Sequence, residues 1–128
     1  MTKSIILLSV VSLLIFSCSV EQNKNDIHIT EFQEKFEYSQ YILVDVRTKE
    51  EFSEGCIQGA INIDYLAENF TIKIQELDLE TPVLLYCRSG NRSSKAMKIM
   101  NELGFQEVYN LEGGIKGWIS ENNLLITE

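Results

Sequence analysis

The 128-residue sequence has few basic residues and a single histidine, and each shortage argues against one kind of function. Its 11 lysines and arginines are outnumbered by 19 aspartates and glutamates, which gives a formal net charge of −8. A nucleic-acid-binding protein needs a basic surface to neutralise phosphates, so the charge balance argues against a nucleic-acid partner. The only histidine, His28, is expected in the first strand, too far from the candidate site below to act as its general base. We expect a structural role for it.

The long hydrophobic run that a membrane span requires is also missing. Lys3 precedes an apolar stretch from Ile5 to Phe16, and Ser17 and Cys18 follow. A helix of this length rises about 18 Å, well short of a hydrocarbon core about 30 Å thick. A cation, a short apolar stretch and a small residue in this order are typical of a secretory signal peptide, expected here over residues 1–17.

The end of this segment, Ile15-Phe16-Ser17-Cys18, resembles a bacterial lipobox, although Phe16 departs from the usual small or branched residue. We therefore expect a lipoprotein with lipid on the sulfur of Cys18, a polar tether over residues 18–26 and one folded domain over residues 27–128. The lipid would be the only membrane anchor, and the domain would lie in the periplasm at the cell membrane or the outer membrane. An ordinary secreted protein and an uncleaved anchor are the alternatives.

Short apolar runs alternate with amphipathic stretches along the rest of the chain, without internal repeats or low-complexity segments. This alternation predicts an α/β fold, with a mainly parallel five-stranded sheet and helices on both faces. Capping boxes predict helix starts at Thr30 with Gln33 and at Thr48 with Glu51. The expected strands are 27–29, 42–45, 60–63, 83–86 and 108–111, and the expected helices are 30–38, 48–55, 67–77, 93–103 and 115–121.

The candidate site is the stretch YCRSGNRS, residues 86–93, which follows the most apolar strand. In parallel sheets, ligands bind beyond the carboxyl ends of the strands, where helix N-termini offer unpaired N–H groups to anions. Gly90 allows the backbone to turn these groups inward, and Arg88 and Arg92 add positive charge. Such surroundings favour a thiolate, so we expect Cys87 to be partly exposed, with a lowered pKa. The alternative is a small buried hydrophobic residue.

Four motifs lie along residues 42–118, namely Asp45–Arg47, Glu51–Asn62, Tyr86–Ser93 and Leu111–Trp118. Their residues and order resemble the rhodanese-like, single-domain sulfurtransferases. The resemblance implies a three-layer α/β sandwich and a catalytic Cys87 that attacks the outer sulfur of thiosulfate or another anionic sulfane-sulfur donor. Cys87 would then carry the sulfur as a persulfide and pass it to a thiol or cyanide acceptor. No cofactor and no metal are implied.

The resemblance also assigns roles to the rest of the loop. Arg88 and Arg92 would hold the anionic oxygens of the donor, and backbone N–H groups would stabilise the persulfide. We expect Asp45 and Arg47 to form a buried ion pair that supports the loop rather than to take part in the chemistry. The expected substrate-binding residues are Arg88, Ser89, Gly90, Asn91, Arg92 and Ser93.

Three other functions use a similar cysteine. The loop of cysteine-dependent phosphatases has the pattern Cys-x5-Arg, whereas Cys87 and Arg92 are spaced as Cys-x4-Arg. A tighter loop suits a sulfur atom better than a phosphoryl group. A non-enzymatic persulfide carrier, or a module that docks an anionic group of a partner, remains open. A redox role is weakened by the lack of a nearby second thiol.

Cys56 departs from the family pattern, which usually has histidine after the glycine at position 55. We expect it near the opposite end of the sheet from Cys87, roughly 12 to 15 Å away at about 3.3 Å per residue. A disulfide needs Cα atoms within about 7 Å, so packing is the expected role of Cys56.

Overall fold

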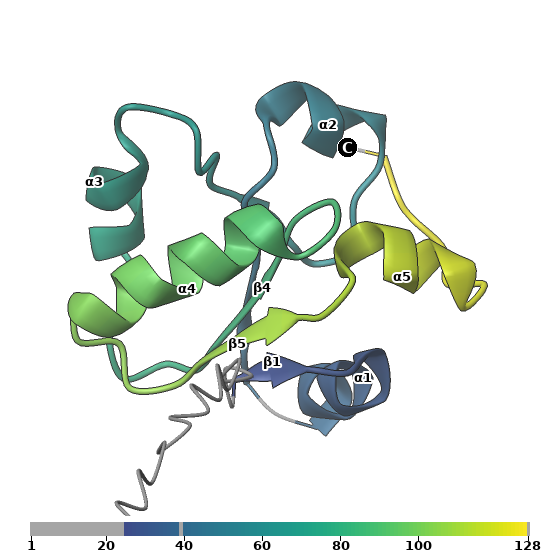
Figure 1. The fold of residues 1–128 in the computed structure, drawn as a ribbon, viewed down its shortest axis with the longest axis horizontal. Coiled ribbons are helices and arrows are strands. Elements are labelled where there is room, and N and C mark those ends of the chain that lie inside the picture. Colours follow the sequence, from purple (N-terminus) through teal and green to yellow (C-terminus); the bar gives the residue numbers. More distant parts are fainter. Residues whose placement is uncertain (1–24, 39, 128) are drawn as a thin grey trace, which may run out of the picture.

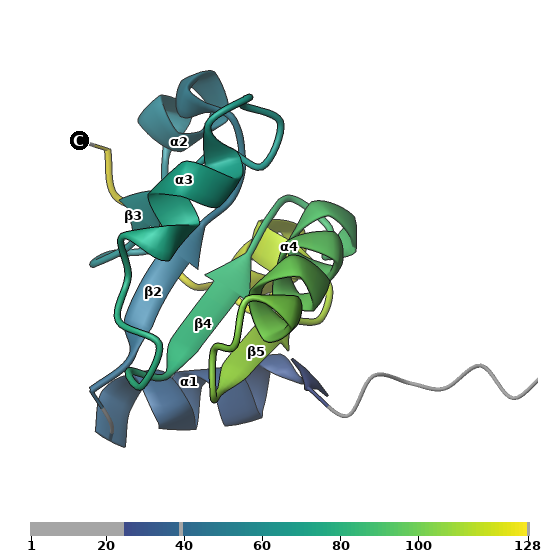
Figure 2. The ribbon, with the colours of Figure 1, turned by 90° about the vertical axis from the view of Figure 1, so that its left-hand side faces the viewer.

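The computed structural model describes residues 25–38 and 40–127 and has the predicted α/β architecture. Five strands form one sheet in the order β1-β5-β4-β2-β3, and all four pairs of neighbouring strands are parallel (Figures 1 and 2). The elements in chain order are β1 (Asp26–Ile27), α1 (Ile29–Tyr38), β2 (Ile42–Asp45), α2 (Lys49–Glu54), β3 (Ile61–Asn62), α3 (Phe70–Gln75), β4 (Val83–Tyr86), α4 (Asn91–Glu102), β5 (Val108–Leu111) and α5 (Gly114–Ser120).

Two hydrophobic clusters, one on each face of the sheet, make the fold a three-layer sandwich. Side chains of a strand alternate between the two faces, so Val83 and Leu85 of β4 enter one cluster and Leu84 and Tyr86 enter the other. Helices α3 and α4 cover the first cluster, whereas α1 and α5 cover the second (Figure 1). All four β4 residues are buried, which explains their uninterrupted apolar sequence.

The strand order places the topological switch point of the sheet between β2 and β4. The chain runs outward from β2 to β3 and then returns past β2 to β4 and β5. After β2 the chain enters α2, whose Phe52 packs on the α1 and α5 side, whereas after β4 it enters α4 on the other side. The two connections therefore separate at their carboxyl ends, where open α/β sheets bind ligands. Both the Asp45–Arg47 motif and Cys87 lie at this point.

The first strand and helix differ from the expected boundaries. The predicted capping box of Thr30 and Gln33 is wrong, because α1 begins at Ile29 and Thr30 lies in its first turn. His28 caps the helix instead, since its carbonyl accepts a hydrogen bond from the Phe32 amide and its Nδ1 accepts one from the Thr30 amide. His28 is therefore outside the strand, and β1 is Asp26–Ile27 rather than residues 27–29.

Two other helices also differ in length. Helix α3 covers only Phe70–Gln75 of the predicted 67–77, because Ala67 bonds in a turn between Asp64 and Phe70. Helix α4 begins at Asn91, two residues earlier than predicted, because Gly90 takes a left-handed φ of 100° and serves as its N-cap. The Thr48 and Glu51 capping box is confirmed, and Gly55 does end α2, although its φ of 150° and ψ of 138° are not left-handed helical angles.

The predicted signal peptide and lipidated Cys18 lie outside the described residues, as does most of the tether. Within the described ranges, no helix combines the length and apolar character that crossing a membrane requires.

Candidate active site

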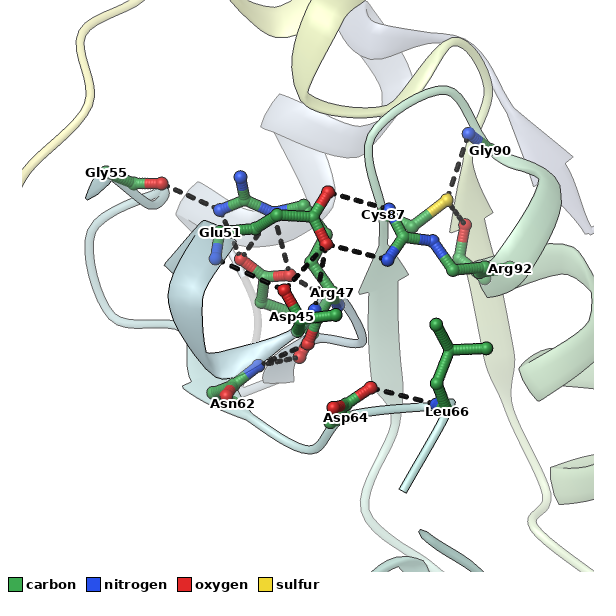
Figure 3. A network of polar contacts seen from close by, with 12 residues as sticks. Asp45, Arg47, Glu51, Gly55, Asn62, Asp64, Leu66, Cys87, Gly90 and Arg92 are labelled. Atoms are coloured by element: carbon green, nitrogen blue, oxygen red, sulfur yellow. Dashed lines mark hydrogen bonds and ion pairs between the residues drawn. The ribbon is translucent and has the colours of Figure 1, made fainter. Parts of the chain in front are cut away.

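Cys87 follows β4 directly, and the loop after it curls around its sulfur (Figure 3). The Gly90 amide donates a hydrogen bond to Cys87 Sγ at 3.1 Å, and the Ser93 hydroxyl donates another at 3.2 Å. The first comes from Gly90, whose φ is 100°, and the second comes from the first turn of α4. The sulfur thus faces two hydrogen-bond donors and the positive end of a helix dipole.

These hydrogen bonds stabilise negative charge on the sulfur. Burial by itself raises the pKa of the Cys87 thiol, but hydrogen bonds from the Ser93 hydroxyl and from the Ser93, Ser89 and Gly90 amides outweigh it and lower the pKa. The sequence also led us to expect a contribution from the flanking guanidinium groups. The structure attributes the lowering mainly to the hydrogen bonds, so the loop backbone and one hydroxyl favour the thiolate.

The expectation that Cys87 is partly exposed is wrong. The residue is 1% exposed, because the loop and the first turn of α4 fold over it. Such burial could indicate an inert hydrophobic cysteine, but the polar donors on the sulfur distinguish it from one.

The Arg92 guanidinium binds a carboxylate from another part of the chain. Its Nη1 and Nη2 donate to Glu51 Oε2 and Oε1 at 2.7 and 2.9 Å (Figure 3). This ion pair, together with hydrogen bonds from Thr48, lowers the pKa of Glu51 to about 2. Glu51 was predicted only as a capping residue, because nothing in the sequence links it to a loop 41 residues away.

The other loop residues lie at the surface. Arg88, Ser89 and Asn91 are exposed, and among the described residues the Arg88 side chain has no hydrogen bond or ion pair. Arg88 is therefore the loop guanidinium available to an anion. The substrate-binding roles of these residues remain predictions.

Asp45 and Arg47 form the buried ion pair expected from the sequence. Arg47 Nη2 lies 2.7 Å from Asp45 Oδ2, and it also donates to the Gly55 carbonyl at 2.7 Å. Their residues are 0% and 6% exposed, so each charge depends on the other for compensation. The side-chain Nδ2 of Asn62 donates to the backbone carbonyls of Asp45 and Arg47, and these hydrogen bonds fix the segment after β2 to β3.

Comparison with known proteins agrees with this geometry. The profile of the rhodanese-like domain matches residues 28–121. The chain belongs to the rhodanese-like domain family. A rhodanese-related protein from Thermoplasma volcanium has a similar structure, with a TM-score of 0.72 and 29% identity over 81% of this chain and 99% of that one.

Two curated relatives carry sulfurtransferase in their names. Thiosulfate sulfurtransferase GlpE from Shewanella oneidensis is 35% identical over 80 residues, which are 62% of this chain and 77% of the relative. Adenylyltransferase and sulfurtransferase UBA4 from Meyerozyma guilliermondii is 37% identical over 89 residues, which are 65% of this chain but only 21% of that protein.

Helix α5 supports the rhodanese-like loop from behind, a role that the sequence did not reveal. The Ile115 and Lys116 amides donate to the carbonyls of Cys87 and Arg88 at 2.9 and 3.1 Å. A Cβ atom at Gly114 would lie 2.6 Å from both of these carbonyl oxygens, and the φ of Gly114 is 58°. Only glycine lets α5 approach the loop this closely. In the sequence, Gly114 is marked only as part of the Leu111–Trp118 motif.

Asn110 links the loop to the first strand. Its Nδ2 donates to Asp26 Oδ1 at 2.8 Å and to the Gly90 carbonyl at 3.2 Å, while its buried Oδ1 has no hydrogen-bond partner in the part of the chain that the structure describes. Asn110 thus contacts the glycine whose amide binds the Cys87 sulfur. A polar residue within the otherwise apolar strand β5 was the available signal.

Cys56 is placed differently from the prediction. Its neighbour Gly55 binds Arg47, and its neighbour Ile57 donates to the Tyr86 hydroxyl, so Cys56 lies near the same edge of the sheet as Cys87. Ile57 belongs to the α1 and α5 cluster, however, and Cys87 to the α3 and α4 cluster. The two cysteines form no disulfide. The backbone of Cys56 pairs with Ile126 in an antiparallel bridge that the sequence did not predict.

Proposed function

We propose that this rhodanese-like protein is a sulfurtransferase that carries a sulfane sulfur as a persulfide on Cys87. The observation behind the proposal is the pair of hydrogen bonds, from the Gly90 amide and the Ser93 hydroxyl, that end on Sγ. A nucleophilic thiolate requires such donors, and the anionic outer sulfur of a persulfide would use the same loop.

The proposed reaction has two steps. In the first, the Cys87 thiolate attacks the outer sulfur of the donor, so a new S–S bond forms on the protein. The S–S bond of the donor breaks, and its electron pair leaves with sulfite, or with a thiolate if the donor is organic. In the second step, a thiol or cyanide attacks the outer sulfur and regenerates the Cys87 thiolate. The reaction is proposed without a histidine base, because hydrogen bonds from the loop lower the pKa of the Cys87 thiol.

Two observations favour sulfur transfer over phosphoryl transfer. Cys87 is 1% exposed, which suits reaction with one sulfur atom better than with a tetrahedral phosphoryl group. Arg92, the candidate phosphate ligand, is bound to Glu51 through both terminal nitrogens. We therefore expect no hydrolysis of aryl phosphates.

Steady-state turnover separates an enzyme from a carrier. We expect repeated conversion of cyanide to thiocyanate with thiosulfate or a small organic persulfide as donor, and no catalysed turnover by Cys87→Ser. A single equivalent of thiocyanate, followed by no further product, would instead identify a carrier. Cys56→Ala is the matched thiol control and should keep its activity, because the Cys56 side chain is 0% exposed.

The cellular location is a separate part of the proposal. A lipid on Cys18 would hold the domain in the periplasm, at the cell membrane or the outer membrane. The full chain should then fractionate with membranes, and Cys18→Ser should release it. Membrane association of Cys18→Ser would overturn the lipid anchor and leave the sulfur chemistry unaffected.

A further inference from the structure

The charge of Arg92 is already compensated within the protein. Its two terminal nitrogens bind both oxygens of Glu51, and the pKa of Glu51 is lowered to about 2, so the carboxylate is ionised at every physiological pH. A bidentate guanidinium–carboxylate pair is directional and among the stronger polar interactions at a partly exposed site. Any donor that binds Arg92 must therefore compete with an internal anion.

Glu51 is itself fixed in place. The Thr48 amide and hydroxyl each donate to Glu51 Oε2 at 3.0 Å, and the Glu51 amide donates back to the Thr48 hydroxyl. This capping box ties the carboxylate to the start of α2 rather than leaving it on a mobile side chain. The pair with Arg92 thus belongs to the folded structure.

The side of the site formed by β2 and β3 adds further negative charge and an apolar surface. Asp64 and Leu66 follow β3 at the same edge of the sheet as Cys87, and the Leu66 amide binds Asp64 Oδ1 at 2.8 Å. In Figure 3 the Leu66 side chain, 64% exposed, points toward the part of the site that holds Arg92. The backbone here is anchored, because the Tyr65 amide donates to the Val46 carbonyl.

These charges do not suit a small dianion. Thiosulfate carries two negative charges and must approach a thiolate. On the β2 and β3 side it would meet a compensated Arg92, the Glu51 and Asp64 carboxylates and the aliphatic Leu66. Within residues 25–38 and 40–127, the Arg88 guanidinium has no internal partner. A donor with an organic part and less negative charge fits this surface better.

We infer that the preferred donor is the persulfide of a small organic thiol with little net negative charge, rather than thiosulfate, and that Glu51 sets this preference. The inference rests on the proposed sulfurtransferase function. The step is balanced, because the Cys87 thiolate takes the outer sulfur of R–S–SH, the proton stays with that sulfur, and R–S⁻ leaves with the electron pair of the broken bond.

The test compares donors that differ mainly in remote charge. The full chain is mixed with the persulfide of cysteamine, the persulfide of 3-mercaptopropionate, or thiosulfate, and the rate of sulfur addition at Cys87 is followed by rapid quenching and intact-protein mass spectrometry. We expect cysteamine persulfide to load fastest. Its advantage over the anionic persulfide should shrink as salt is raised, because exposed charges are screened.

The decisive variant is Glu51→Gln, which removes the charge but retains an oxygen that can accept from Thr48. The ratio of the cysteamine to the mercaptopropionate rate should fall about fivefold, as expected for one unit charge about 8 Å from the substituent in a largely aqueous environment. Loading from thiosulfate should become faster. Glu54→Gln is the control, because it makes the same change in net charge at an exposed position of α2.

Asp64→Asn provides a second variant, because it removes the Asp64 carboxylate charge and keeps an oxygen that can accept from the Leu66 amide. A fall in the ratio for this variant supports the preference for a donor with little negative charge even if Glu51→Gln fails to fold, and the part assigned to Glu51 then rests on the comparison of Glu51→Gln with Glu54→Gln. Faster loading of the wild type from thiosulfate than from cysteamine persulfide would overturn the inference, as would a ratio unaffected by either variant, but both results leave sulfur transfer intact. Failure of Cys87 to load from any donor would overturn the proposed function as well.

Discussion

Replacing Ser93 with alanine should raise the pKa of Cys87 by about one to two units. The Ser93 hydroxyl is fully buried and donates to Cys87 Sγ at 3.2 Å. A hydrogen bond to a charged group contributes about 1.5 to 3 kcal/mol, and one pKa unit corresponds to about 1.4 kcal/mol. The hydrogen bond from the Gly90 amide, 3.1 Å from the sulfur, remains in the variant, so the loop backbone should still lower the pKa of Cys87.

The pKa can be measured from the ultraviolet absorbance of the thiolate and from the pH dependence of alkylation. Each titration of a Cys56→Ala protein is compared with the same protein lacking Cys87, which isolates the signal of one thiol. Ser94→Ala is the matched control, because Ser94 is the next residue of α4 and its hydrogen bond to the Gly90 carbonyl comes from the backbone amide, which the substitution keeps. A Ser93→Ala pKa within about 0.3 units of the parent would refute the assignment of the lowered pKa to this hydroxyl.

Three further changes test the surroundings of the loop. Arg47→Met should lower the free energy of unfolding in urea by about 3 to 5 kcal/mol, because it leaves the buried Asp45 charge without compensation; a loss below about 1 kcal/mol would contradict this. Gly114→Ala should cost about 2 to 4 kcal/mol and slow alkylation of the Cys87 thiol, since its Cβ would collide with the carbonyls of Cys87 and Arg88; an unchanged thermal midpoint would argue against the close approach. The lowered pKa of Glu51 stabilises the folded state above the unfolded pKa near 4.5, and this stabilisation should disappear as the pH falls toward 2. Glu51→Gln should remove that part of the acid dependence of unfolding, and identical acid profiles would contradict the ion pair with Arg92.

The sequence predicts the architecture well because its signals are local and strong. The runs at 42–45, 83–86 and 108–111 are strands in the structure with those bounds. Boundaries fail where one residue changes the backbone path. Gly90 starts α4 early through its positive φ, and His28 replaces Thr30 as the cap of α1. Such effects depend on backbone angles and on side-chain rotamers, which hydrophobic periodicity does not report.

The candidate site is predictable only where its parts are adjacent in the sequence. Cys87 and Gly90 lie in one loop, and the Asp45 and Arg47 pair is two residues apart, so their spacing already indicated a role. Glu51 and Gly114 reach the loop through tertiary contacts, and no local pattern identifies those contacts. The expected exposure of Cys87 was wrong for the same reason, because closure of the loop over the sulfur is a tertiary property.

The most direct test of the account is the mass of the intact protein after incubation with a sulfane-sulfur donor and removal of excess reagent. The account predicts a gain of one sulfur atom, located on the peptide that contains Cys87 and released by cyanide as thiocyanate. The gain should be retained in Cys56→Ala and absent in Cys87→Ser. No added sulfur with thiosulfate or with organic persulfides, or an equal gain in Cys87→Ser, would contradict the claim that Cys87 carries the transferred sulfur.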